Sequence, residues 1–96
     1  MVYRKSSLDD GSLINIMGGR LKELRLKQQL TLEELEERVN ISSRMLGNYE
    51  RGDNVITIET IIKLYNAQVF DDYLDIEDLV QVLIIEPIKI ANELDQ

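Results

Sequence analysis

Residues 31–52 read TLEELEERVNISSRMLGNYERG, and this stretch decides how the chain folds. It predicts two short helices joined by a tight turn, because each helix end carries a residue suited to that end. Thr31 and Glu34 are spaced so that each side chain can bond the backbone N–H of the other, in a capping box. Ser42 suits the N-cap of the second helix, and Gly52 suits the position just after its last turn.

Apolar residues indicate which face of each predicted helix turns inward. Leu32, Leu35 and Val39 fall on one face of the first helix. Leu46 and Tyr49 are the expected inward anchors of the second helix. Two short capped helices separated by a few residues are typical of a helix-turn-helix, in which the second helix enters the major groove of DNA.

Length and residue types narrow the class of protein. The 96 residues suffice for one domain with a modest core. The chain has no cysteine and no histidine, which excludes disulfides, His-based catalytic relays and the usual zinc sites. No apolar run approaches the roughly 20 residues that cross a bilayer, and the N-terminus lacks the apolar core of a signal peptide. We therefore expect a cytoplasmic protein without metal or cofactor, and no enzyme.

The net charge of −7 argues by itself against a nucleic-acid partner. The distribution of the charges reverses that argument. Residues 13–66 hold eight basic and eight acidic side chains, whereas residues 67–96 hold one basic and eight acidic side chains. The excess negative charge therefore belongs to the C-terminal part, and the helix-turn-helix portion is neutral.

The whole chain is predicted to be all-α, a compact bundle of about five helices. Residues 1–12 read as a polar arm that ends in a candidate N-cap, Ser12. Apolar residues at helical spacing then predict a helix from Leu13 to about Gln29, with Gly18-Gly19 in its middle. Glycine costs about 1 kcal/mol in a helix interior. Either the helix frays or kinks at this pair, or it begins at Gly18 after a separate lead-in.

Further helices are expected after the motif. Thr57 caps one that runs to about Gln68, and its inward face consists of Ile58, Ile61, Ile62 and Tyr65. Asp75 caps another, which Pro87 ends, because the residue before proline is pushed out of the α region. Alternatively, Pro87 stands at the first position of a last short helical turn.

The expected recognition helix is Ser42–Arg51. Its outward positions, once Leu46 and Tyr49 face inward, are Ser43, Arg44, Gly47, Asn48 and Arg51. Arginine pairs bidentately with guanine, and asparagine with adenine. On an isolated helix, Arg44 and Asn48 would more often only solvate the surface. The capping residues around them favour the DNA-binding interpretation.

The stretch Arg20–Leu64 resembles the helix-turn-helix domain of the phage repressor and Cro family, the xenobiotic-response-element type. The matching motif residues are Arg20, Leu24-Arg25, Leu30-Thr31, Glu34-Leu35, Ile41-Ser42, Tyr49-Glu50 and Gly52. The resemblance implies base contacts at Ser43, Arg44 and Asn48. It also implies an ion pair between Arg25 and Glu50. Contacts to the DNA backbone are expected at Thr31, Leu32, Ser42, Gly47 and Arg51.

Three residues depart from the family pattern. Leu32 stands where the family usually has glutamine, and Asn40 replaces a turn glycine, although asparagine also tolerates positive φ. Glu36 replaces a small residue, normally alanine, at the contact between the two helices. Together with Glu33, Glu34 and Glu37, it makes the first motif helix acidic, which opposes the approach of phosphate.

Residues 13–68 are thus the expected DNA-binding domain, and residues 69–96 an acidic helical extension. The extension bears a weaker resemblance to HipB-like regulators, which are dimers and in some cases antitoxins. Its apolar residues exceed what a small solvated tail needs, so a dimer or partner surface is expected at Leu79, Val82, Leu83, Ile85 and Ile88. We predict a dimeric, sequence-specific repressor of a prokaryote or phage. The alternative is a protein-interaction module, such as an antitoxin, that acts through its acidic surface.

Overall fold

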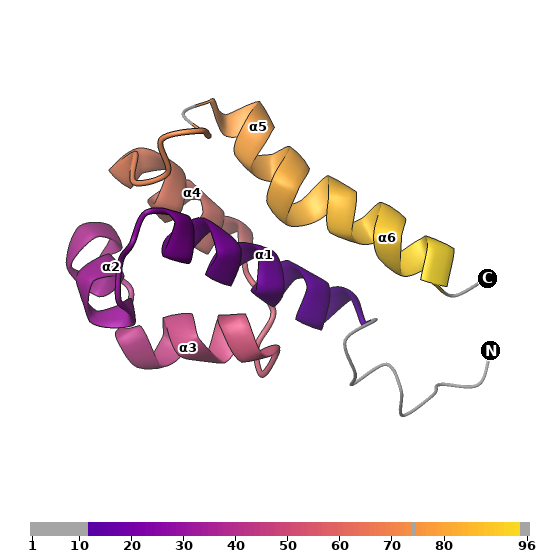
Figure 1. Ribbon diagram of the computed structural model, residues 1–96, viewed down its shortest axis with the longest axis horizontal. Coiled ribbons are helices and arrows are strands. Elements are labelled where there is room, and N and C mark those ends of the chain that lie inside the picture. Colours follow the sequence, from indigo (N-terminus) through magenta and orange to yellow (C-terminus); the bar gives the residue numbers. More distant parts are fainter. Residues whose placement is uncertain (1–11, 74, 95–96) are drawn as a thin grey trace.

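The computed structural model describes residues 12–73 and 75–94. Their helices are α1 (Leu13–Lys27), α2 (Leu32–Val39), α3 (Ser43–Arg51), α4 (Ile58–Ala67), α5 (Ile76–Val80), the π-helical turn η2 (Gln81–Ile85) and α6 (Glu86–Leu94). No strand occurs among these residues, so the all-α prediction is confirmed. Figure 1 shows α1 between α3 and a rod formed by α5, η2 and α6. None of the described helices is long and apolar enough to cross a membrane.

Helix α1 runs without interruption through its two glycines. Ser12 is the N-cap, and its hydroxyl accepts from the N–H of Asn15 at 3.2 Å; the rest of the predicted arm lies outside the described residues. A Cβ atom built on Gly18 would lie 2.1 Å from the carbonyl oxygen of Tyr49, so α1 and α3 touch at this point. Nothing lies within 4 Å of a Cβ atom built on Gly19. Both expectations for the pair, a kink or a helix start, are therefore wrong: Gly18 permits close helix packing.

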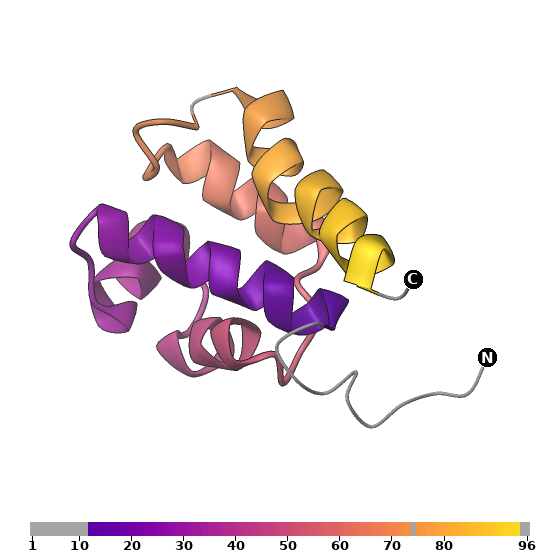
Figure 2. The same ribbon diagram turned by 45° about the vertical axis from the view of Figure 1, so that its right-hand side comes forward.

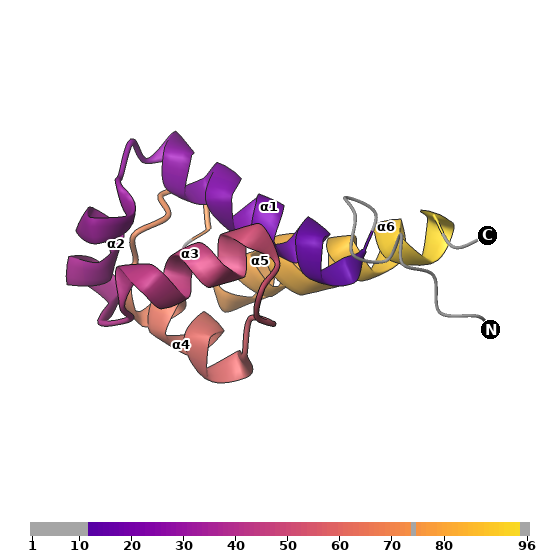
Figure 3. The same ribbon diagram turned by 90° about the horizontal axis from the view of Figure 1, so that it is seen from below.

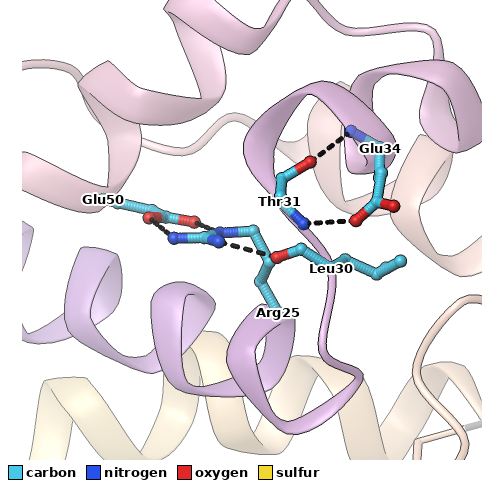
Figure 4. Close-up of polar contacts among 5 residues, drawn as sticks. All are labelled: Arg25, Leu30, Thr31, Glu34 and Glu50. Atoms are coloured by element: carbon cyan, nitrogen blue, oxygen red, sulfur yellow. Dashed lines mark hydrogen bonds and ion pairs between the residues drawn. The ribbon is translucent and has the colours of Figure 1, made fainter.

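The predicted caps of α2 and α3 are confirmed. The Thr31 hydroxyl accepts from the Glu34 N–H at 3.0 Å, and the Glu34 carboxylate accepts from the Thr31 N–H at 2.8 Å (Figure 4). Asn40 adopts φ of 60° after α2. The Ser42 hydroxyl accepts from the Met45 N–H at 3.1 Å, and Gly52 ends α3 with φ of 80°. Local residue choice thus determines both helices and the turn between them.

Pro87 does not end the helix that precedes it. The rod continues from α5 through η2 into α6, and the Glu86 N–H donates to the carbonyl oxygen of Gln81, five residues back. Proline in a helix normally loses a hydrogen bond and collides with the carbonyl oxygen four residues earlier. The wider π-helical turn before Pro87 relieves that conflict. Asp75 precedes α5 as expected, but its side chain makes no capping hydrogen bond.

The rod completes the core. It begins against α4 and continues along α1 (Figure 2). Leu79, Val82 and Leu83 are buried in the chain's own core, so the expectation that they face a partner is wrong. Only Ile85 and Ile88 of that set remain exposed. The core runs across the expected division after residue 68, because it includes the residues on both sides, Leu64, Val69 and Phe70.

Two ion pairs fasten α1 to the C-terminal part. Arg20 of α1 contacts Glu86 of α6 at 2.7 Å. Lys27, the last residue of α1, pairs with Asp72 in the segment that leads to α5. Both pairs are solvent-accessible, so they orient the rod more than they stabilise it.

Helix α4 buries only part of the predicted face: Ile61 is buried and Tyr65 packs against the core, but Ile58 and Ile62 are exposed. Its inward residues are Thr60, Ile61 and Leu64, whereas Ile58 and Ile62 are 74% and 48% exposed. The hydroxyls of Thr60 and Tyr49 hydrogen-bond to each other at 2.9 Å in the interior. Helix α4 has more apolar residues than fit on one face. The face that turns inward is the one that carries Thr60, whose hydroxyl bonds Tyr49 of α3.

Leu46 offers a direct test of the α3 packing, since it is completely buried. We expect Leu46→Ala to lower the free energy of unfolding by about 2–5 kcal/mol, from lost burial and the cavity left behind. Met45→Ala is the matched control, because the neighbouring side chain is exposed. Urea unfolding of both variants measures the difference. Equal stability of the two variants would show that the orientation of α3 is wrong.

Candidate nucleic-acid interface

Helix α3 presents one face to solvent. Seen from below (Figure 3), it lies in front of α1 and the rod, and its residues Leu46 and Tyr49 are buried. Arg44 and Arg51 are exposed, and Ser43 and Asn48 are half-buried at the same surface of the molecule. The three expected base-contacting residues, Ser43, Arg44 and Asn48, therefore all retain solvent access on one helix.

A buried ion pair holds α3 in place (Figure 4). The Arg25 Nε donates to Glu50 Oε2 at 2.7 Å, and Nη2 donates to Oε1 at 2.9 Å. The remaining Nη1 donates to the carbonyl oxygen of Leu30 at 2.7 Å. The hydrogen bonds to Glu50 raise the pKa of Arg25 above its ordinary value, against the opposing effect of burial. The arginine thus joins α1, the end of α3 and the residue before the α2 cap. The structure contains the ion pair that the family resemblance implies.

Arg51 is folded back along α3. Its Nη2 donates to Asn48 Oδ1 at 2.5 Å, and its Nε donates to Asp53 Oδ2 at 3.1 Å. A bidentate contact of asparagine with adenine uses the same Oδ1 to accept from adenine N6. Arg51 therefore already uses one of the two lone pairs of the oxygen that a contact with adenine would need.

Gly47 is not at the surface, contrary to the prediction. It is buried, and a Cβ atom built on it would lie 3.0 Å from Arg51 Nη1 and 3.5 Å from Leu32 Cδ1. These two side chains cover the glycine, so its backbone is not available for a DNA contact in this arrangement. Thr31 and Ser42 remain exposed at the starts of α2 and α3, and Leu32 is half-buried.

Glu36 is expected from the sequence at the contact between the two helices, but no bond from it to the start of α3 was predicted. Its Oε1 accepts from the backbone N–H of Ser43 at 2.9 Å, which puts a carboxylate beside the first residue of α3. The two residues lie on different helices, so no periodic pattern indicates the contact; the unusual residue type was the only signal. Among the described residues, no group of acidic side chains could hold a metal ion.

A family profile and several known proteins match this chain. The profile of the helix-turn-helix family matches residues 21–67. An HTH-type transcriptional regulatory protein of Pyrococcus abyssi is 39% identical over 64 residues, which are 67% of this chain and 20% of that protein. The HTH-type transcriptional regulator ImmR of Bacillus subtilis is 42% identical over 59 residues, which are 60% of this chain and 46% of ImmR. No solved structure matches the chain.

The residues that the family profile matches include α3 and the Arg25–Glu50 pair that supports it. The chain spans a fifth of the Pyrococcus abyssi relative and less than half of ImmR. The matched residues include the capping box, the turn at Asn40 and the closing Gly52, all of which adopt the geometry of a helix-turn-helix. Residues 21–67 therefore form a domain of the helix-turn-helix family.

Proposed function

We propose that the protein is a sequence-specific, double-stranded DNA-binding regulator of transcription that acts as a dimeric repressor. The observation that carries this proposal is the outward face of α3, where Arg44 and Asn48 stand on a helix anchored by the Arg25–Glu50 pair. The relatives bear the names of HTH-type transcriptional regulators, which supports the same role. In this proposal α3 lies in the major groove.

The contacts divide into two classes. Arg44 reads guanine, Asn48 reads adenine, and Ser43 bonds a base edge or phosphate near the start of α3. The exposed hydroxyls of Thr31 and Ser42 lie at the starts of α2 and α3 and can donate to phosphate oxygens. Arg51 reaches a phosphate once it releases Asn48. Leu32 supplies only its backbone N–H, because its side chain covers Gly47.

The binding test is a titration of DNA from upstream of the protein's own gene, with unrelated DNA as competitor. We expect Arg44→Ala to weaken binding to the specific site by about 1–3 kcal/mol and to relax preference at one base pair. Adding Asn48→Ala should abolish the selectivity. Lys89→Ala is the control, because Lys89 is exposed on α6, away from α3. The proposal fails if the double variant selects its site as well as the parent protein does.

The dimer proposal rests on exposed apolar residues near α3. Ile58 and Ile62 stand one turn apart on α4, and Val55, 53% exposed, lies in the loop that joins α3 to α4. Exposed apolar residues gathered in this way are typical of interaction surfaces. A symmetric dimer of this kind presents its two recognition helices to half-sites about 34 Å apart, one turn of DNA. We propose that a second copy of the chain covers this surface.

Sedimentation velocity tests the dimer surface. We expect Ile58→Asp/Ile62→Asp to be a monomer with a native melting curve, because the charges prevent burial of α4. Ile85→Asp/Ile88→Asp is the matched control; these residues are 37% and 40% exposed on the rod. A monomeric control beside a dimeric α4 variant would move the interface to the rod, as the sequence predicted.

A protein partner is the second candidate. An acidic surface lies at the start of α5, more than 20 residues after α3 in the sequence. It consists of the exposed side chains of Asp75, Glu77 and Asp78. Such a surface suits a basic partner, as in an antitoxin. Absence of selective DNA binding in the titration, together with indifference to Arg44→Ala, would favour this candidate.

A further inference from the structure

The start of α3 is closed by acceptors from the protein itself. A helix begins with backbone N–H groups that have no partner within the helix. In this chain the Ser42 hydroxyl takes the Met45 N–H, and the Glu36 carboxylate takes the Ser43 N–H at 2.9 Å. Two of the N–H groups that would otherwise favour a phosphate are thus occupied. One of their acceptors is a carboxylate, which repels phosphate.

Glu36 is at the same time close to the expected base-reading residues. It is half-buried between α2 and α3, and it contacts Ser43 directly, next to Arg44. In a helix-turn-helix complex the start of the second helix meets the base edges. Only one carboxylate oxygen, Oε1, is bonded to Ser43, so the group keeps capacity to accept another hydrogen bond.

The bases differ in what they offer to a carboxylate. Guanine presents two acceptors in the major groove and thymine presents O4, so both place acceptor against acceptor. Adenine presents an amine, but its N7 acceptor is beside it. Cytosine presents the N4 amine with no acceptor beside it on the same base, and glutamate accepts from it. A carboxylate at this place therefore distinguishes cytosine from the other three bases.

We propose that Glu36 is a specificity-determining residue, which selects a cytosine opposite the start of α3 by accepting from its N4 amine. This inference rests on the proposed function, because it requires α3 in the major groove. It assigns Glu36 two bonds at once, one to Ser43 and one to the base. Glu36, which departs from the family pattern, then makes binding more selective for one base. Its charge also weakens binding to DNA of any sequence, because it repels phosphate.

The experiment is a selection from a duplex library randomised over the binding site, with the parent protein, Glu36→Gln and Glu37→Gln. Glutamine can still accept from the Ser43 N–H, so the fold is kept, and glutamine pairs with adenine rather than cytosine. We expect one cytosine position of the parent consensus to become adenine in Glu36→Gln. Glu37→Gln, an exposed neighbour on α2, should keep the cytosine.

Affinity measurements on fixed duplexes complete the test. The parent protein should bind the consensus about tenfold more tightly than the same duplex with that cytosine replaced by thymine, and Glu36→Gln should lose the difference. An unchanged consensus in Glu36→Gln would overturn the inference and leave Glu36 as a cap of α3, while the proposed function stands. A parent protein that selects no consensus would overturn both.

Discussion

Replacing Gly18 by alanine is expected to lower the free energy of unfolding by about 3 kcal/mol or more. The added Cβ atom would lie 2.1 Å from the Tyr49 carbonyl oxygen and 2.9 Å from that of Glu50. Both atoms belong to the backbone of α3, so no side chain can rotate away to make room. Helices α1 and α3 must separate, which disturbs the core and the face that carries Arg44.

Gly19→Ala is the matched control for this prediction. It lies in the same helix, one residue along, and nothing lies within 4 Å of its Cβ position. Alanine is the better helix former, so we expect this variant to be more stable by about 0.5–1 kcal/mol. Urea unfolding of the two variants should give changes of opposite sign. A stable Gly18→Ala protein would mean that α1 and α3 are farther apart than described.

Breaking the Arg25–Glu50 pair is the second change with a large expected effect. We expect Arg25→Met to lower the free energy of unfolding by about 3–5 kcal/mol, because it leaves a buried carboxylate without its partner. The two side chains are only 10% and 6% exposed. The variant also loses the hydrogen bond to Leu30, which supports the start of α2. The variant should also bind DNA less tightly, because the Arg25–Glu50 pair orients α3.

Two further variants test whether the loss of stability in Arg25→Met comes from the buried, unpaired carboxylate of Glu50. Arg25→Met/Glu50→Leu removes both charges and should recover much of the loss, because a buried ion pair contributes less than its breakage costs. Lys27→Met breaks the exposed pair with Asp72 in the same helix and should change stability little. If Arg25→Met is as mild as Lys27→Met, the pair is not buried.

Much of the helix-turn-helix was predictable because its signals are local. Each cap needs only a residue and its neighbours a few positions away, as the bonds of Thr31 with Glu34 and of Ser42 with Met45 illustrate. The positive φ of Asn40 and Gly52 likewise follows from residue type. The ion pair of Arg25 and Glu50 was predicted only from the resemblance to a family, because no local pattern indicates a contact between these two positions.

The candidate site was predicted in its residues but not in its contacts. Ser43, Arg44 and Asn48 do share an accessible surface. Periodicity placed Gly47 on the same face, yet the side chains of Leu32 and Arg51 cover it. The bond from Ser43 to Glu36 also joins two helices, and it depends on the angle at which they meet. Sequence spacing carries no information on that angle.

By itself, the sequence determined that the described part of the chain is helical, where α2 and α3 begin and end, and that Arg44 and Asn48 of α3 keep access to solvent. Tertiary structure alone decided that Gly18 brings α1 onto α3, that α4 leaves Ile58 exposed, and that the rod fills the core with Leu79. The physical reason is the distance along the sequence over which each interaction acts. Caps and turns are set by hydrogen bonds between near neighbours, whereas the choice among apolar faces depends on which surfaces fit together once all helices are present.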